Sequence, residues 1–144
     1  LPVERFMVGV KQTALQPGEL IEAVELRLVD GFQGYSKVGV RNAMVIATAS
    51  ACLVTDTSTG SVRVALGSVA PTVIRVPAAE QLVAEAGDWG ALAIPDAAVR
   101  AAGDAAAAAS RPIDDHRSSA AYRRHAVKVM VERLVRRAFA GEPS

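Results

Sequence analysis

The stretch YSKVGVRNAMVIATASACL, residues 35–53, joins a short polar beginning to a long apolar run. Lys37 and Arg41 stand four residues apart with Gly39 between them, directly before that run. From Met44 to Val54 the only polar groups are hydroxyls, so the segment has no polar face. This pattern predicts a central strand that is buried on both sides.

Shorter runs of alternating apolar and polar residues flank this central segment. The alternation from Leu20 to Leu28 predicts a half-buried strand, and Phe32–Gly39 predicts a second strand that ends at Gly39. The turn-forming residues Thr55–Gly60 separate the central run from a further alternating run over 61–66. These last two runs are therefore expected to form a hairpin.

The second half of the sequence is helical in character. Helices are predicted over Ala78–Ala86 and over the alanine-rich stretch Asp96–Ala109. A last helix is expected to be capped by Ser118 or Ser119 and to end at Gly141. Four strands followed by three helices, without alternating βαβ units, predict an α+β fold. In this fold an antiparallel sheet of three to four strands carries the helices on one face.

Composition narrows the possible functions. The 144 residues fit a single domain, and the net charge of +1 argues against a strongly electrostatic role with nucleic acids or membrane surfaces. The single cysteine, Cys52, excludes a disulfide framework and an all-cysteine zinc or iron–sulfur site within the chain. No apolar run is long enough to span a bilayer, and no signal peptide is recognised. We expect a soluble, cytoplasmic protein.

Common catalytic patterns are absent from the sequence. It contains no G-x-S-x-G elbow, no P-loop and no G-x-G-x-x-G fingerprint. The two histidines, His116 and His125, have no cysteine or carboxylate partners at a convincing metal-ligand spacing, so no metal site is predicted. We do not expect this domain to perform bond chemistry by itself.

The last predicted helix is rich in cations, which could form a nucleic-acid-binding ridge. No aromatic residues interleave with them, and cations near the C-terminus of a helix are favoured by its dipole. A solvated charged face is the preferred interpretation of this set: Arg117, Arg123, Arg124, Lys128, Arg133, Arg136 and Arg137.

The two cations of the opening stretch allow two interpretations. Lys37 and Arg41 could reach a common point at the sheet edge, while Gly39 would let a planar group approach the backbone. They could equally be ordinary surface cations that flank a core strand. Spacing alone leaves both interpretations open.

Four sequence blocks, in order, resemble the C-terminal domain of the FAD-binding (medium) subunit of molybdenum hydroxylases, the family of xanthine dehydrogenase and carbon monoxide dehydrogenase. The resemblance extends from about Phe6 to Ala138. The family domain is itself an α+β sandwich of antiparallel strands followed by helices. The blocks are FMVGVKQTALQPGELIEAVEL, YSKVGVRNAMVIATAS, VRVALGSVAPTVIR and SRPIDDHRSSAAYRRHAVKVMVERLVRRA.

The resemblance implies a role in electron transfer. In such enzymes a large subunit with the molybdenum cofactor oxidises the substrate and a small subunit relays electrons through two [2Fe-2S] clusters. The FAD of the medium subunit then passes them to an acceptor. Residues 1–144 would form one domain and one wall of the FAD site. An N-terminal domain that holds the FAD pyrophosphate is expected upstream, so the isolated chain is not expected to be active.

The resemblance also assigns site residues. Lys37 matches the family lysine beside the isoalloxazine ring, and Arg41 matches a recurrent basic position, so Lys37, Gly39 and Arg41 are the predicted FAD-binding residues. Xanthine dehydrogenases like the mammalian enzyme carry an acidic residue a few positions further on, but residues 42–45 here contain no carboxylate. NAD is therefore in doubt as the acceptor, which is left open.

Three residues of the last block, Asp115, Arg117 and Tyr122, also match recurrent family positions. We interpret them as structural, capping and bracing the last helix. An alternative hypothesis for the whole chain is a non-catalytic protein-interaction module with no cofactor, in which the apolar face of the sheet would dock another protein.

Overall fold

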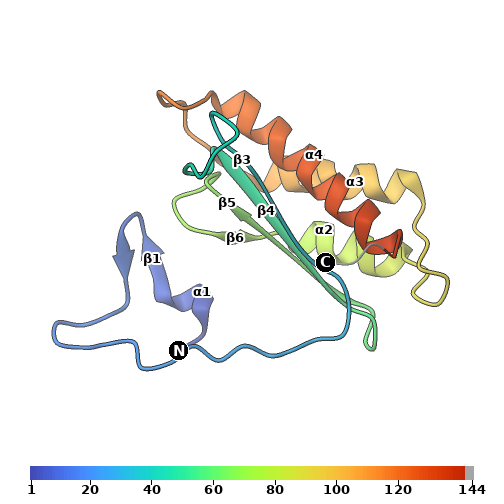
Figure 1. Cartoon of the computed structure of the whole chain (residues 1–144), viewed down its shortest axis with the longest axis horizontal. Coiled ribbons are helices and arrows are strands. Elements are labelled where there is room, and N and C mark those ends of the chain that lie inside the picture. The colour runs from blue at the N-terminus through green and yellow to red at the C-terminus, as the bar shows by residue number, and fades with distance from the viewer. Residues whose placement is uncertain (142–144) are drawn as a thin grey trace.

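The computed structural model describes residues 1–141. These residues form two β-sheets and four helices, in the chain order that the colours of Figure 1 follow. The elements are α1 (Val3–Phe6), β1 (Met7–Gly9), β2 (Gln12–Thr13), β3 (Gln33–Val38), β4 (Ala49–Asp56), β5 (Ser61–Gly67), β6 (Ile74–Arg75), α2 (Pro77–Ala86), α3 (Asp96–Ala109) and α4 (Ala120–Phe139).

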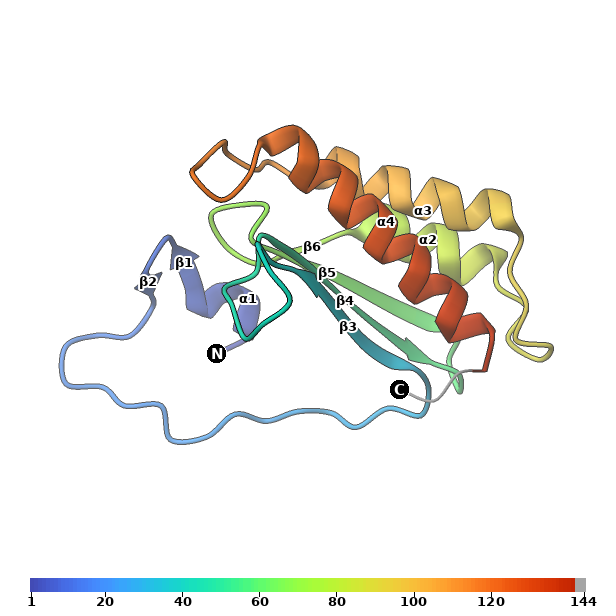
Figure 2. The same ribbon diagram turned by 45° about the horizontal axis from the view of Figure 1, so that its top comes forward.

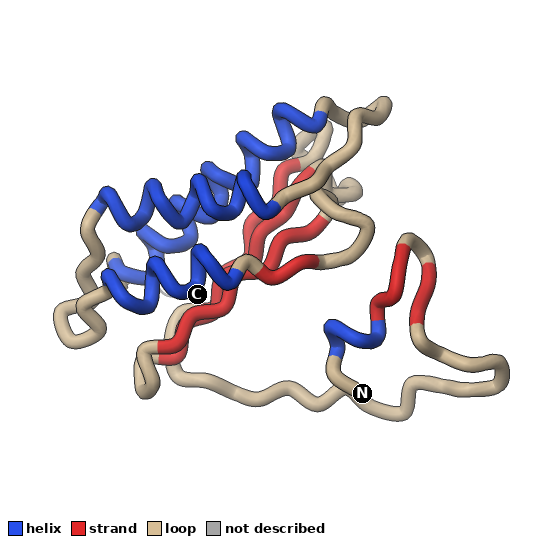
Figure 3. The backbone as a smooth tube through the Cα atoms, turned by 180° about the vertical axis from the view of Figure 1, so that it is seen from behind, coloured by secondary structure: helices blue, strands red, loops and turns tan. Residues whose placement is uncertain are grey.

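The main sheet has four antiparallel strands in the order β3-β4-β5-β6. Helices α2, α3 and α4 lie on one side of it, and the first thirty or so residues lie on the other, as Figures 1 and 2 both show. The view from behind in Figure 3 shows the strands between these two parts. The predicted α+β fold, an antiparallel sheet with helices on one face, is confirmed.

Strand β4 is the centre of the sheet, and its residues explain why. Ala49, Ala51 and Leu53 point toward the helices and are buried. The predicted hairpin from β4 to β5 is present, and the carboxylate of Asp56 begins its turn by accepting hydrogen bonds from the backbone N–H and the hydroxyl of Ser58. A short polar turn therefore joins the two most buried strands.

The three long helices begin and end close to the predicted positions. Pro77 occupies the first turn of α2, and the hydroxyl of Ser119 caps α4 by accepting a hydrogen bond from the backbone N–H of Tyr122. Gly103 lets α3 approach α4 closely, because a Cβ added there would lie 2.7 Å from Cγ of Glu132 and 3.1 Å from a backbone oxygen. Small residues thus permit a tightly layered helical face.

The strand predicted over Leu20–Leu28 is absent. These residues are extended but have no strand partner, and the fourth strand of the sheet is the short β6, Ile74–Arg75. A strand of two residues is too short to produce a recognisable alternation. The alternation over 20–28 is typical of a strand, but among residues 1–141 this segment pairs with neither β-sheet.

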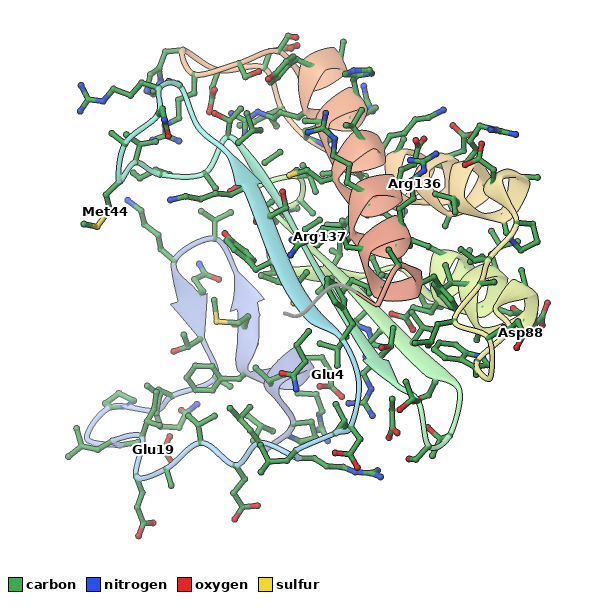
Figure 4. All side chains as sticks on the ribbon, turned by 45° about the vertical axis from the view of Figure 1, so that its right-hand side comes forward. Glu4, Glu19, Met44, Asp88, Arg136 and Arg137 are labelled. Atoms are coloured by element: carbon green, nitrogen blue, oxygen red, sulfur yellow. The ribbon has the colours of Figure 1, made fainter. Side chains whose placement is uncertain are left out.

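The central strand begins later than predicted. Residues 44–48 belong to a loop, and β4 starts at Ala49. Met44 is completely exposed and points away from the sheet in Figure 4. The loop closes where the backbone N–H of Thr48 donates to the carbonyl of Val38 at 2.7 Å. An apolar run was therefore mistaken for a longer strand, because periodicity cannot separate a buried strand from an apolar loop.

Within residues 1–141, no helix combines the length and the apolar character needed to cross a bilayer.

Replacing a buried residue of β4 tests this packing. Leu53→Ala should lower the free energy of unfolding by about 2–5 kcal/mol, because a completely buried leucine leaves a cavity. The matched control Ile113→Ala removes an exposed aliphatic side chain and should change stability by no more than about 0.5 kcal/mol. Denaturant unfolding measures both values, and equal losses would contradict the assignment of the core.

Candidate functional site

The three predicted site residues lie around one hollow beside the loop that joins β3 to β4. Its volume is about 260 Å³. Two cations and no carboxylate line it, so the hollow suits an electron-rich or anionic group. Its lining residues are Lys37, Val38, Gly39, Arg41, Asn42, Ala43 and Val45.

Lys37 projects from the bare face of the sheet. It lies opposite Ser50 in the register of β3 and β4, on the face that the helices leave uncovered. Its Nζ donates a hydrogen bond to the carbonyl oxygen of Val45 at 2.9 Å. An ammonium group has three N–H donors, so two remain for a ligand. The cation is thus held in place by the loop without being neutralised by it.

Gly39 allows the loop to fold back onto the strand. A Cβ at this position would lie 2.3 Å from Cγ2 of Val45, which is closer than two carbon atoms can approach. The same valine supplies the carbonyl that accepts from Lys37. The neighbour that requires glycine here is therefore the loop itself, which sequence reasoning did not anticipate.

Arg41 lies in the same loop and is exposed. Among residues 1–141 no carboxylate forms an ion pair with it. Asn42 and Ala43 follow it in the lining, and neither side chain carries a carboxylate. The hollow therefore keeps two uncompensated positive charges close together.

Sequence reasoning missed Tyr35 as a candidate site residue. It lies two residues before Lys37 on the same strand face, and 61% of it is exposed. Its neighbour across the sheet is Cys52, whose thiol pKa is raised by burial, which disfavours the reactive thiolate form. A large aromatic ring beside a cation on a bare sheet face offers a stacking surface to a planar ligand. The alternation of β3 could have shown that Tyr35 and Lys37 share a face.

A second hollow of about 390 Å³ also has Gly39 in its lining. It brings the β3–β4 loop together with the start of α4. Arg117 and Tyr122, interpreted from the sequence as structural, line this surface with exposed or partly exposed side chains. The remaining lining residues are Gly39, Val40, Thr48 and Ser118.

Arg123 is buried, so its assignment to a solvated charged face is wrong. Only 5% of the residue is exposed. Its Nη1 donates to the carbonyls of Thr48 at 3.0 Å and Ser68 at 2.9 Å, and its Nη2 donates to Oδ1 of Asp115 at 2.6 Å. Only Nε finds no acceptor among residues 1–141. Arg123 lies four positions before the buried Val127, so the helical period could have placed it on the apolar stripe.

Asp115 holds this arginine and the turn before α4 at the same time. Its carboxylate accepts hydrogen bonds from the backbone N–H groups of Arg117 and Ser118, at 2.9 and 3.1 Å. The bond from the Arg117 backbone is the main cause that lowers the pKa of Asp115, and the guanidinium of Arg123 lowers it further. These contacts agree with a structural role for Asp115.

Other cations of α4 pair with acids of α3. Lys128 bonds to Asp104, and Arg136 bonds to Asp96 at 3.0 Å and to Glu132 of its own helix. Figure 4 shows Arg136 on the side of α4 that faces α3. The positive charge of this helix is therefore balanced in part within the domain, which weakens the case for a nucleic-acid ridge.

Within residues 1–141, no cluster of three histidine, cysteine, aspartate or glutamate side chains is suited to hold a metal ion.

Comparison with known proteins decides the family. The family described as CO dehydrogenase flavoprotein C-terminal domain matches residues 35–138. The chain belongs to this family. The match runs from within β3 to the last turn of α4 and includes the hollow around Lys37, so the resemblance to the FAD-binding subunit of molybdenum hydroxylases is confirmed.

Solved structures extend the similarity from residues 35–138 to nearly the whole of this chain. Carbon monoxide dehydrogenase from Hydrogenophaga pseudoflava is 32% identical, with a TM-score of 0.80 over 95% of this chain. Reconstituted CO dehydrogenase from Oligotropha carboxidovorans is 30% identical, with a TM-score of 0.77 over 94% of this chain. Quinoline 2-oxidoreductase from Pseudomonas putida 86 shares the fold at 22% identity and a TM-score of 0.80.

The domain spans only 47% of each of these three solved chains. No sequence among curated proteins matches it.

The ion pair between Asp115 and Arg123 predicts that the stability of the domain depends on pH. The pKa of Asp115 is lower in the folded than in the unfolded chain. Its contribution to the free energy of unfolding is therefore complete above the unfolded pKa of about 3.9 and is lost as the pH falls through the folded pKa. Asp115→Asn should therefore be less stable than the native chain at pH 7, and this difference should shrink below about pH 4. Denaturant unfolding at pH 7 and pH 3 measures it.

Glu25→Gln is the control, since Glu25 makes no ion pair or side-chain hydrogen bond among residues 1–141 and its removal should have little effect at either pH. If the free energy of unfolding of Asp115→Asn differs from that of the native chain by the same amount at both pH values, the proposed role of the Asp115–Arg123 ion pair is contradicted.

Proposed function

We propose that this domain forms one wall of an FAD site in a multi-subunit molybdenum hydroxylase and takes part in electron transfer to an external acceptor. The observation that carries the proposal is the hollow lined by both Lys37, on the sheet face that the helices leave bare, and Arg41, in the loop that follows. Family membership over residues 35–138 supports it. Bound FAD would supply the redox chemistry, accepting electrons and passing them on.

The side chains of the hollow fit such a group. Lys37 keeps a positive charge at a fixed place because Val45 holds its ammonium, and two of its N–H donors stay available. A positive charge there would stabilise the negative charge that develops on a flavin when it is reduced, and so raise its potential. Tyr35 adds an aromatic surface next to that charge.

Further parts of the enzyme belong to the same proposal. An N-terminal domain would hold the FAD pyrophosphate, and the solved relatives are about twice as long as this chain. A large molybdenum subunit and a small subunit with [2Fe-2S] clusters would complete a cytoplasmic hetero-oligomer. The electron acceptor stays open in this proposal.

The visible absorbance spectrum tests the proposal. The protein made from the complete reading frame around this segment should show flavin bands, because it would contain both walls of the site. The 144-residue chain alone should be colourless. A colourless complete protein, purified under conditions that retain cofactors, would overturn the proposal and favour an interaction module without a cofactor.

Lys37→Met in the complete flavoprotein should lower the flavin midpoint potential by roughly 20 mV. The estimate takes about 1 kcal/mol for one charge contact in water and about 30 mV per 1.4 kcal/mol for a two-electron couple. Lys128→Met is the matched control, since Lys128 bonds to Asp104 in the helical layer on the opposite side of the sheet. A redox titration measures both potentials, and an unchanged value for Lys37→Met would refute the role of Lys37.

A further inference from the structure

The segment Leu20–Leu28 exposes several large apolar side chains in a row, which is unusual for the surface of a soluble protein. Leu20, Val24, Leu26 and Leu28 are 91%, 75%, 82% and 90% exposed. From Val24 onward the apolar residues alternate with charged ones, so Val24, Leu26 and Leu28 share one face of the extended chain. An apolar row of this kind marks a surface that is meant to be covered.

The backbone of this segment is also unpaired. Among residues 1–141, no backbone hydrogen bond involves residues 20–29. Pairing resumes at Asp30, whose carbonyl accepts from the backbone N–H of Thr57 at 2.8 Å. Figures 1 and 3 both show the segment running without a neighbouring strand. Extended backbone with free donors and acceptors is suited to pair with the edge of a sheet.

The similar structures indicate where such an edge would be. The match to the Hydrogenophaga enzyme covers 95% of this chain, so only about seven residues of the 144 lie outside it. The solved chain is about twice as long as this one, which covers 47% of it, so a second half of such a subunit is available to supply a sheet edge.

We propose that Leu20–Leu28 is a strand that adds to the edge of a β-sheet in the other half of the same flavoprotein subunit. This inference rests on the proposed function. The sheet edge would supply backbone partners, and an apolar layer beneath it would cover Val24, Leu26 and Leu28. Because β3 begins at Gln33, the added strand would lead almost directly into the strand that carries Lys37. It would thereby set the position of the Lys37 hollow against the other half.

Amide hydrogen exchange in the complete subunit tests this strand. Peptides that cover residues 20–29 should exchange at least about tenfold more slowly than unstructured amides, and the protection should not depend on protein concentration. Exchange at the unstructured rate would overturn the proposal. Protection that disappears on dilution would overturn it as well, since it would show that the strand pairs with a second copy.

A pair of variants in the complete subunit separates the two faces of the strand. Leu26→Asp should raise the exchange of residues 20–29 at least about tenfold, because it places a charge in the covered layer. Glu25→Lys, on the opposite face, should leave it unchanged. Equal exchange in both variants would refute the assignment of the faces.

A flavin spectrum of the same samples keeps the two proposals apart. Flavin bands with unprotected residues 20–29 would refute only the strand. A colourless subunit with protected residues 20–29 would refute only the proposed function.

Discussion

One guanidinium group joins the parts of this domain that matter most. Arg123 lies on the buried stripe of α4 and donates to a carbonyl before β4, to a carbonyl after β5 and to the carboxylate of Asp115. A buried charge is costly unless it is paired and hydrogen-bonded, so these acceptors must stay where they are. The start of α4, the sheet and the loops at one end of it are therefore held in one arrangement.

The candidate site depends on this arrangement through Thr48. Its carbonyl accepts from Arg123, and its N–H donates to Val38, which closes the loop between β3 and β4. The same loop contains Val45, whose carbonyl orients Lys37 and whose side chain packs over Gly39. Helices fill one face of the sheet and leave the other to the hollow, so stability and ligand contact are separated on the two faces.

Much of the fold could be predicted because its signals are local. The hairpin turn, the proline at the start of α2 and the serine cap of α4 all depend on near neighbours in sequence. The errors occurred where distant contacts decide. Leu20–Leu28 has the pattern of a strand but no partner here, and β6 is too short to show a pattern. Arg123 is a different case, because the helical period could have placed it on the buried stripe but could not have named the carbonyls to which it bonds.

The sequence by itself determined the fold class, the three long helices and the identity of Lys37, Gly39 and Arg41 as candidate site residues. Alternation, helical period and capping depend on residues that are close together in sequence. The four family blocks can likewise be recognised, in their order, from the sequence alone. Only the tertiary structure decided that these three residues share one hollow and that Arg123 bonds to Thr48, Ser68 and Asp115. Such relations depend on hydrogen bonds and packing between residues far apart in the chain, and no local pattern encodes them.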